Sequence, residues 1–144
     1  NEFKRCLEDG KLRVFKASKA MIKKELCASS YDLERASQSL KDNDAKWATI
    51  QGYYAMFHCA RALILDNGYR EKSHRCLLIA LQHLFIDTGK MPSKYLEYLR
   101  EAMDLREDAD YGFIYSDESA QNTIENAKDF YNFTIKYFQK RTKQ

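Results

Sequence analysis

Residues 45–66 read AKWATIQGYYAMFHCARALILD, and apolar side chains would cover almost the whole circumference of a helix in this segment. One stripe of that helix consists of larger apolar residues, namely Trp47, Ile50, Tyr54, Phe57 and Ile64. A helix that is apolar nearly all round is buried at the centre of a fold. We therefore expect residues 45–66 to form a central helix, which Asn67-Gly68 ends.

Four further segments show the spacing of apolar residues that is typical of amphipathic helices. These helices are expected at about residues 18–40, 73–88, 92–110 and 116–138, after a short piece at 3–12. Short connections between long amphipathic helices are typical of antiparallel bundles. The sequence therefore predicts an all-α fold, an antiparallel up-and-down bundle of four to five helices.

The composition agrees with a single helical domain. The 144 residues are enough for one ordinary domain with its own core, so we expect residues 1–144 to form one domain. A single Pro and five Gly leave few turn residues for a fold of many short strands. The net charge of +3 neither requires nor excludes a nucleic-acid partner.

The cysteines and the apolar runs indicate the compartment. Cys6, Cys27, Cys59 and Cys76 form no C-x-x-C pair, so we expect them to act as small hydrophobic residues in a reducing cytoplasm. The longest purely apolar run, residues 76–81, is too short to span a membrane, and no secretory signal opens the chain. No residue spacing indicates a metal site or a cofactor.

Two charged residues continue an apolar stripe. In the helix expected at 92–110, the inward positions Leu96, Leu99 and Met103 lead on to Arg106 and Asp110. Burying a charge costs several kcal/mol unless the charge is paired. The pattern therefore predicts either a structural salt bridge near the end of the bundle or a functional polar site.

The histidines offer further candidates for a phosphate-binding site. His74 follows Ser73, the expected cap of a helix whose N-terminus attracts anions, and Arg70 and Arg75 lie close by in sequence. This segment is either a phosphate-contacting corner or a solvated basic turn. His58 is a candidate binding residue on the central helix, where a lone histidine is also commonly a satisfied core or interface residue.

Three segments carry a resemblance to a known family. They read GYYAMFHCARA at 52–62, YREKSHRCL at 69–77 and LREDADYG at 105–112. Together they resemble the signature blocks of a prokaryotic, UPF0332-like branch of the HEPN domain family. The resemblance spans about residues 17–138 and is specific, because the tyrosine pair, Ser-His and Arg-x-x-Ala-Asp-Tyr occur together.

This resemblance implies a helical bundle that is often homodimeric and often encoded beside a small nucleotidyltransferase as a toxin and antitoxin pair. Catalytic members are metal-independent ribonucleases with an Arg, four to six residues and then a His. The Arg stabilises the phosphate, and the His acts as acid or base on the RNA 2′-OH. Arg106 matches that Arg, but Tyr111 follows after four residues, and the last histidine of the chain is His83.

Three functions remain open. In the leading hypothesis the chain is a nucleotide- or RNA-binding module with a nucleotidyltransferase partner, in which Arg106, Asp110 and Tyr111 hold a phosphate and His74 and Arg75 join from another helix end. The first alternative is a metal-independent ribonuclease toxin in which Arg106 works with His74 or Tyr111. The second is a non-catalytic dimeric interaction protein. The incomplete Arg and His motif leaves enzymatic activity undecided.

Overall fold

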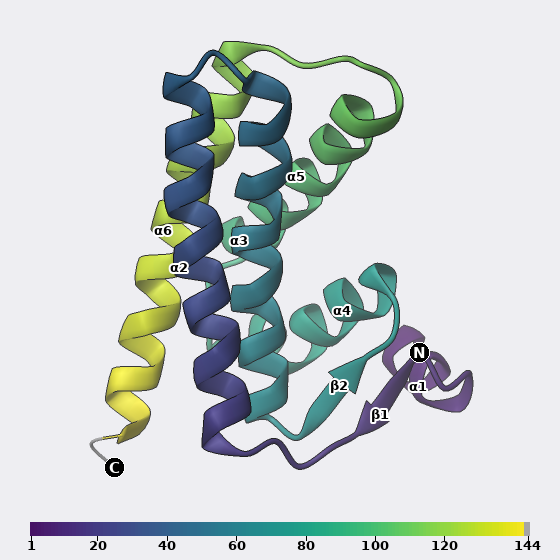
Figure 1. Ribbon diagram of the computed structural model, residues 1–144. Coiled ribbons are helices and arrows are strands. Elements are labelled where there is room, and N and C mark those ends of the chain that lie inside the picture. The colour runs from purple at the N-terminus through teal and green to yellow at the C-terminus, as the bar shows by residue number, and fades with distance from the viewer. Residues whose placement is uncertain (143–144) are drawn as a thin grey trace.

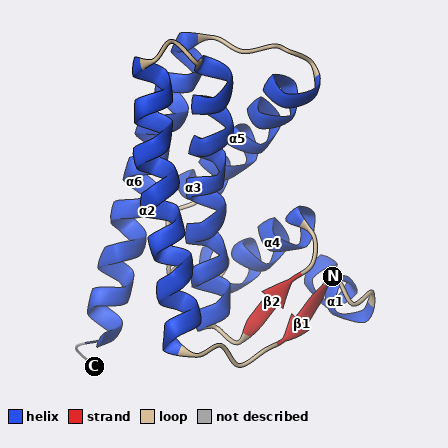
Figure 2. Cartoon of the chain, in the orientation of Figure 1, coloured by secondary structure: helices blue, strands red, loops and turns tan. Residues whose placement is uncertain are grey.

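The computed structural model describes residues 1–142, and helices make up most of this part of the chain (Figures 1 and 2). The helices are α1 (Glu2–Glu8), α2 (Lys19–Lys41), α3 (Ala45–Asp66), α4 (His74–Leu81), α5 (Lys94–Tyr111) and α6 (Asp117–Thr142). The long helices α2, α3, α5 and α6 alternate in direction along the chain (Figure 1). The predicted all-α, up-and-down helical bundle is therefore confirmed.

Helix α3 is the centre of the bundle, with the bounds predicted from the sequence. Helices α2, α5 and α6 all pack against it, and Met56, Ala60 and Leu63 on α3 are fully buried. Trp47 was expected in the buried stripe, yet it is 48% exposed. The first turn of α3 instead buries its small residues, Ala45 and Ala48, in a cluster of alanines contributed also by α2 and α6.

Side-chain oxygens cap the N-termini of several helices, three of which begin the elements that build the bundle and the site. The Ser18 hydroxyl accepts from the Met21 N–H of α2 at 3.1 Å, and the Ser73 hydroxyl accepts from the Cys76 N–H of α4 at 3.1 Å. Asp44 caps α3. These caps fix where each helix begins, and the Ser73 cap fixes the position of His74 as the first residue of α4.

A small antiparallel sheet was not expected. Strand β1 (Leu12–Val14) pairs with β2 (Tyr69–Glu71), so that Arg13 lies opposite Arg70. Gly68 has a φ of +89°, which a glycine adopts at little cost, and it turns the chain from the end of α3 into β2. The sheet ties the N-terminal segment to the entrance of α4 (Figure 2).

The helix expected at 73–88 is not regular along its length. Helix α4 ends at Leu81 and continues as a π-helical turn, Gln82–Ile86, in which the Asp87 N–H donates to the Gln82 carbonyl at 2.9 Å. Apolar periodicity does not distinguish such a turn from an α-helix, because the same side chains remain buried. None of the helices within residues 1–142 combines the length and the apolar character that a bilayer span requires.

Two of the cysteines correct the sequence-based expectation. Cys6 of α1 and Cys76 of α4 form a disulfide, although 70 residues separate them in sequence. Their pairing arises from the docking of α1 against the first turn of α4, which spacing along the chain does not reveal. Cys59 does behave as predicted, since it is buried, and burial raises the pKa of its thiol to about 11.

Candidate functional site

Arg106 reaches from α5 to the aromatic face of α3. Its guanidinium carbon lies 5.3 Å from the centre of the Tyr53 ring and 5.9 Å from that of Tyr54. At these distances the faces of the rings attract the cation. The Nε atom of Arg106 is buried and has no hydrogen-bond partner within residues 1–142.

Of the two alternatives that the sequence left open, the salt bridge between Arg106 and Asp110 does not form within residues 1–142, because no carboxylate in that part of the chain lies within ion-pair distance of Arg106. Aromatic rings surround the guanidinium where a carboxylate would have stood in that alternative. A ring face attracts a cation but accepts hydrogen bonds poorly, so the guanidinium keeps donor capacity for another group.

His74 meets the same tyrosine from α4. Its Nδ1 atom and the Tyr53 hydroxyl are 2.5 Å apart and share a hydrogen bond. The imidazole also lies against the Phe57 ring, with 4.7 Å between the ring centres. Burial, and next the positive charge of Arg106, lower the pKa of His74 below its ordinary value of 6.5. The histidine is therefore neutral at pH 7.

Tyr53, Tyr54, His74 and Arg106 together form what we call the Tyr53 site. Tyr53 is 1% exposed, and burial raises the pKa of its phenol, so that the hydroxyl keeps its proton. Three helices build the site, because α3 supplies the tyrosines, α4 the histidine and α5 the arginine. A neutral imidazole and a partly buried guanidinium that meet at one tyrosine can bind an anion and can also transfer a proton.

The sequence named Arg106 and His74 as candidates but did not connect them with Tyr53. The tyrosine pair served only as part of a family signature, because aromatic residues on a central helix are typical of a hydrophobic core. The signal that could have found Tyr53 was its position one helical turn before Phe57, on the face that also meets α4 and α5.

His58 lies in a different environment. Its Nδ1 is 2.6 Å from a Glu25 carboxylate oxygen, and its Nε2 is 3.4 Å from Asp32. Burial alone would lower the pKa of His58, but its hydrogen bonds with Asp32 and Glu25 raise it to about 9. Arg61 extends this cluster to Glu71 at 2.7 Å. The charge of His58 is thus already matched by two carboxylates.

The remaining candidates lie apart from the Tyr53 site. Arg75 is exposed and forms an ion pair with Glu2 at 2.8 Å, while the Arg70 guanidinium lies 5.3 Å from the Phe15 ring centre. Asp110 is half-buried near the end of α5, and Tyr111, its last residue, is 76% exposed. Among residues 1–142, no group of three or more His, Cys, Asp or Glu side chains is arranged to hold a metal ion.

Comparison with known proteins identifies a domain family and several relatives that this sequence resembles. The sequence model of the HEPN domain matches residues 15–138. A Methanocaldococcus jannaschii protein whose name proposes it as a toxin is 30% identical over 114 residues, which cover 73% of this chain and 78% of that protein.

Two relatives carry the name UPF0332 protein. The one from Archaeoglobus fulgidus is 38% identical over 77 residues, covering 54% of this chain and 60% of the relative. The one from Thermotoga maritima is 28% identical over 100 residues, covering 68% and 76%. The domain match includes α2, α3, α5, most of α6 and the whole Tyr53 site. This chain belongs to the HEPN domain family.

Proposed function

We propose that the chain is a HEPN nucleotide- or RNA-binding module whose Tyr53 site binds a phosphate group. The observation that carries this proposal is the buried, unpartnered Nε of Arg106 within residues 1–142. A buried donor without an acceptor costs about 1 to 3 kcal/mol, and a phosphate oxygen can remove that cost. Arginine suits this role because its planar guanidinium matches the oxygens of a phosphate.

The neighbours of Arg106 support an anionic ligand. The Tyr53 and Tyr54 rings hold the guanidinium without neutralising it, unlike Arg61, which contacts the carboxylates of Glu25 and Glu71. His74 is neutral and offers a ring nitrogen for a further hydrogen bond. A nucleotide or an RNA phosphate matches this set of groups.

The module acts, in this proposal, as a homodimer within a pair that resembles a toxin and its antitoxin, with a nucleotidyltransferase as the partner. A toxin-named relative supports the toxin-like character. The nucleotidyltransferase and the dimer rest on the resemblance of the three sequence blocks. An adjacent reading frame for a nucleotidyltransferase would support the pairing, and its absence from the genome would count against it.

The test is ligand binding by Arg106→Ala. Removal of the guanidinium should weaken binding of AMP or of a short single-stranded RNA by about tenfold or more, since a charge-assisted hydrogen bond contributes about 1.5 to 3 kcal/mol. Arg100→Ala is the matched control, because Arg100 lies on the same helix, is exposed and forms an ion pair with Glu97, away from the Tyr53 site. Equal affinity of wild type and Arg106→Ala would reject the proposal.

A second candidate function is metal-independent RNA cleavage. The observation that favours it is that a neutral His74 bonds to the hydroxyl of the tyrosine whose ring Arg106 packs on, although the histidine that the family motif requires after Arg106 is missing. In this reaction His74 takes the proton of the RNA 2′-OH, whose oxygen attacks the adjacent phosphorus, while Arg106 stabilises the negative charge that develops and the 5′-oxygen leaves with a proton from water.

Cleavage assays in EDTA separate the two functions. If His74 is the base, His74→Ala should abolish cleavage but retain RNA binding. As pH rises, the wild-type rate should reach its plateau before pH 6.5, because the lowered pKa of His74 leaves the imidazole deprotonated there. RNA that is bound but stays intact in EDTA would leave the binding module as the function of the site.

A further inference from the structure

The two ends of the bundle differ in charge. The loop from α5 to α6 lies at one end, and the start of α2 and the end of α6 lie at the other (Figure 1). Residues 107–118, at the first end, include five acidic residues and no Lys or Arg. Residues 16–24, at the opposite end, include four Lys and no acidic residue. The loop between α5 and α6 is therefore acidic and the start of α2 is basic, while Lys46 at the beginning of α3 also reaches the loop, with its Nζ 4.9 Å from the centre of the Phe113 ring.

The acidic end carries exposed apolar side chains. We call residues 111–115 the aromatic loop, in which Phe113 is 73% exposed and Ile114 is 67% exposed. Phe113 has a φ of +54°, an unfavourable conformation for a bulky residue. The Ile114 N–H donates to the Asp108 carbonyl at 3.0 Å and holds the loop in this shape. Apolar groups presented on a held, strained turn are typical of an interaction surface.

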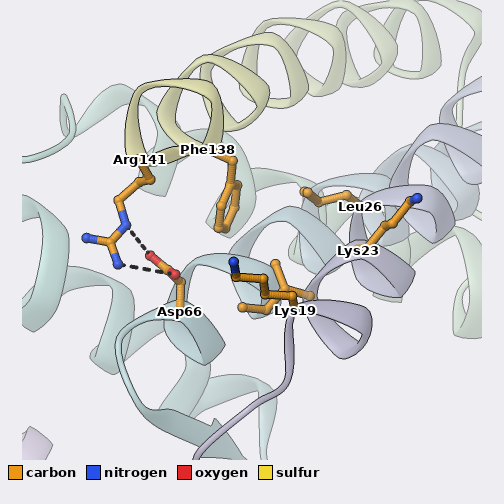
Figure 3. Close-up of a pocket in the computed structure, with 7 residues that line it drawn as sticks. Lys19, Lys23, Leu26, Asp66, Phe138 and Arg141 are labelled. Atoms are coloured by element: carbon orange, nitrogen blue, oxygen red, sulfur yellow. Dashed lines mark hydrogen bonds and ion pairs between the residues drawn. The ribbon is translucent and has the colours of Figure 1, made fainter. Parts of the chain in front are cut away.

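The basic end carries a cavity of about 470 Å³ between α2, the end of α3 and α6 (Figure 3). We call it the basic pocket. Its walls are apolar, and its rim is cationic, and it is lined by Lys19, Ile22, Lys23, Leu26, Asp66, Phe138 and Arg141.

Two of the cations on the rim have no acidic partner. Arg141 is engaged, because its Nε lies 3.0 Å from the Asp66 carboxylate. Lys19 and Lys23, in contrast, form no ion pair within residues 1–142. They are one turn apart on α2, where like charges repel each other. An occupant of this pocket should therefore be apolar and flanked by acidic groups.

We propose that the aromatic loop of one copy of this chain docks in the basic pocket of a second copy, head to tail. Phe113 and Ile114 would enter the pocket between its apolar walls, while the acidic residues flanking the loop, such as Asp110 and Asp117, would face the lysines of the rim. The two surfaces lie at opposite ends of one chain, so the contact is heterologous. Such a contact generates rings or open chains rather than closing as a two-fold dimer.

Charge reversal on the rim tests the proposal. The variant is Lys19→Glu with Lys23→Glu, and its matched control is Lys16→Glu with Lys24→Glu, which are also exposed on this end of the chain but do not line the pocket. Light scattering coupled to size exclusion should show wild type and control growing in mass with concentration, and more so at low salt. The pocket variant should lose the larger species.

A loop variant makes the test specific for a head-to-tail contact. Phe113→Gly with Ile114→Ser removes the apolar groups, and glycine adopts the positive φ of Phe113 without strain. This variant should also lose the larger species, and mixing it with the pocket variant should restore association in one-to-one stoichiometry, because each supplies the surface that the other lacks.

Two outcomes would overturn the proposal. One is a mixture that stays at the size of the separate variants, which would show an interface that is not head to tail. The other is a wild type with the same mass as both variants at every concentration, which would show that the aromatic loop does not dock in the pocket of a second copy. Because none of these substitutions touches the Tyr53 site, RNA or AMP binding should be unaffected by them.

Discussion

Arg106 and His58 both place positive charge inside the bundle, and they differ in what balances it. Two carboxylates hold His58, whereas two tyrosine rings hold Arg106. A charge paired with carboxylates is already neutralised within the fold, while a charge held by tyrosines retains the capacity to bind an anion. This difference is the physical reason for assigning a structural role to His58 and a ligand-binding role to Arg106.

The pairing of His58 predicts a pH-dependent stability. Its folded-state pKa of about 9 lies above the ordinary 6.5, so its contribution is fully present below about pH 6.5 and is lost as pH rises through about 9. The shift corresponds to as much as about 3 kcal/mol. Urea unfolding across this range should show the decline, and His58→Gln should flatten it. A wild-type profile as flat as that of His58→Gln would contradict the ion pairs.

Gly52 controls the approach of α3 to α6. A Cβ atom at this position would lie 2.9 Å from the Thr123 methyl carbon, closer than real contacts allow. Gly52→Ala should therefore lower the free energy of unfolding by about 1 to 3 kcal/mol. Thr123→Ser removes that methyl but keeps the hydroxyl that bonds to Ser119, so the double variant should recover most of the loss. Purely additive effects would show that the contact is not responsible.

Among the secondary-structure elements, the sequence predicted the long helices, because long stretches of apolar periodicity encode them. Helix α3 has its predicted bounds, and Ser73 caps α4 as expected. The three-residue strands β1 and β2 were missed because such short segments show no alternation, and their pairing joins segments more than fifty residues apart. The disulfide was missed for the same reason. Tertiary contact decides these features, and no local pattern encodes it.

The residues of the Tyr53 site also fall into those that a local sequence pattern indicated and those that depended on tertiary packing. Charge on an apolar stripe indicated Arg106, and a helix cap indicated His74, since both are local signals. Their convergence on one tyrosine depends on how α4 and α5 pack against α3. The tyrosine rings that replace the predicted partner Asp110 could be identified only once that packing was known.

Helix α1 and strand β1 are joined to the rest of the chain through the Cys6–Cys76 disulfide. The crosslink spans 70 residues, for which loop entropy predicts about 4 kcal/mol of stabilisation. Unfolding by urea with and without a dithiol should show this difference, and Cys6→Ser with Cys76→Ser should remove the response to the dithiol. Cys27→Ser is the control, since Cys27 is a free, exposed thiol. Identical wild-type curves in both conditions would contradict a stabilising crosslink.

At the scale of the molecule, the bundle separates three chemical surfaces. The Tyr53 site lies where α3, α4 and α5 meet, the aromatic loop lies at the acidic end, and the basic pocket lies at the opposite end (Figures 1 and 3). The proposed ligand binding and the proposed head-to-tail association would therefore use different residues. Variants of one surface serve as controls for the other, and the two proposals can fail independently.

If the Tyr53 site binds a phosphate as proposed, the buried Nε–H of Arg106 donates to the ligand, and the NMR signal of that group reports on the bond. The Nε–H resonance of Arg106 can be assigned in a ¹⁵N spectrum by its loss in Arg106→Lys, and followed during titration with AMP or a short single-stranded RNA. The structure predicts that this resonance shifts with the same affinity as the bulk binding curve, because the ligand supplies the acceptor that Nε lacks. A resonance that does not move while the ligand binds would contradict the assignment of the Tyr53 site.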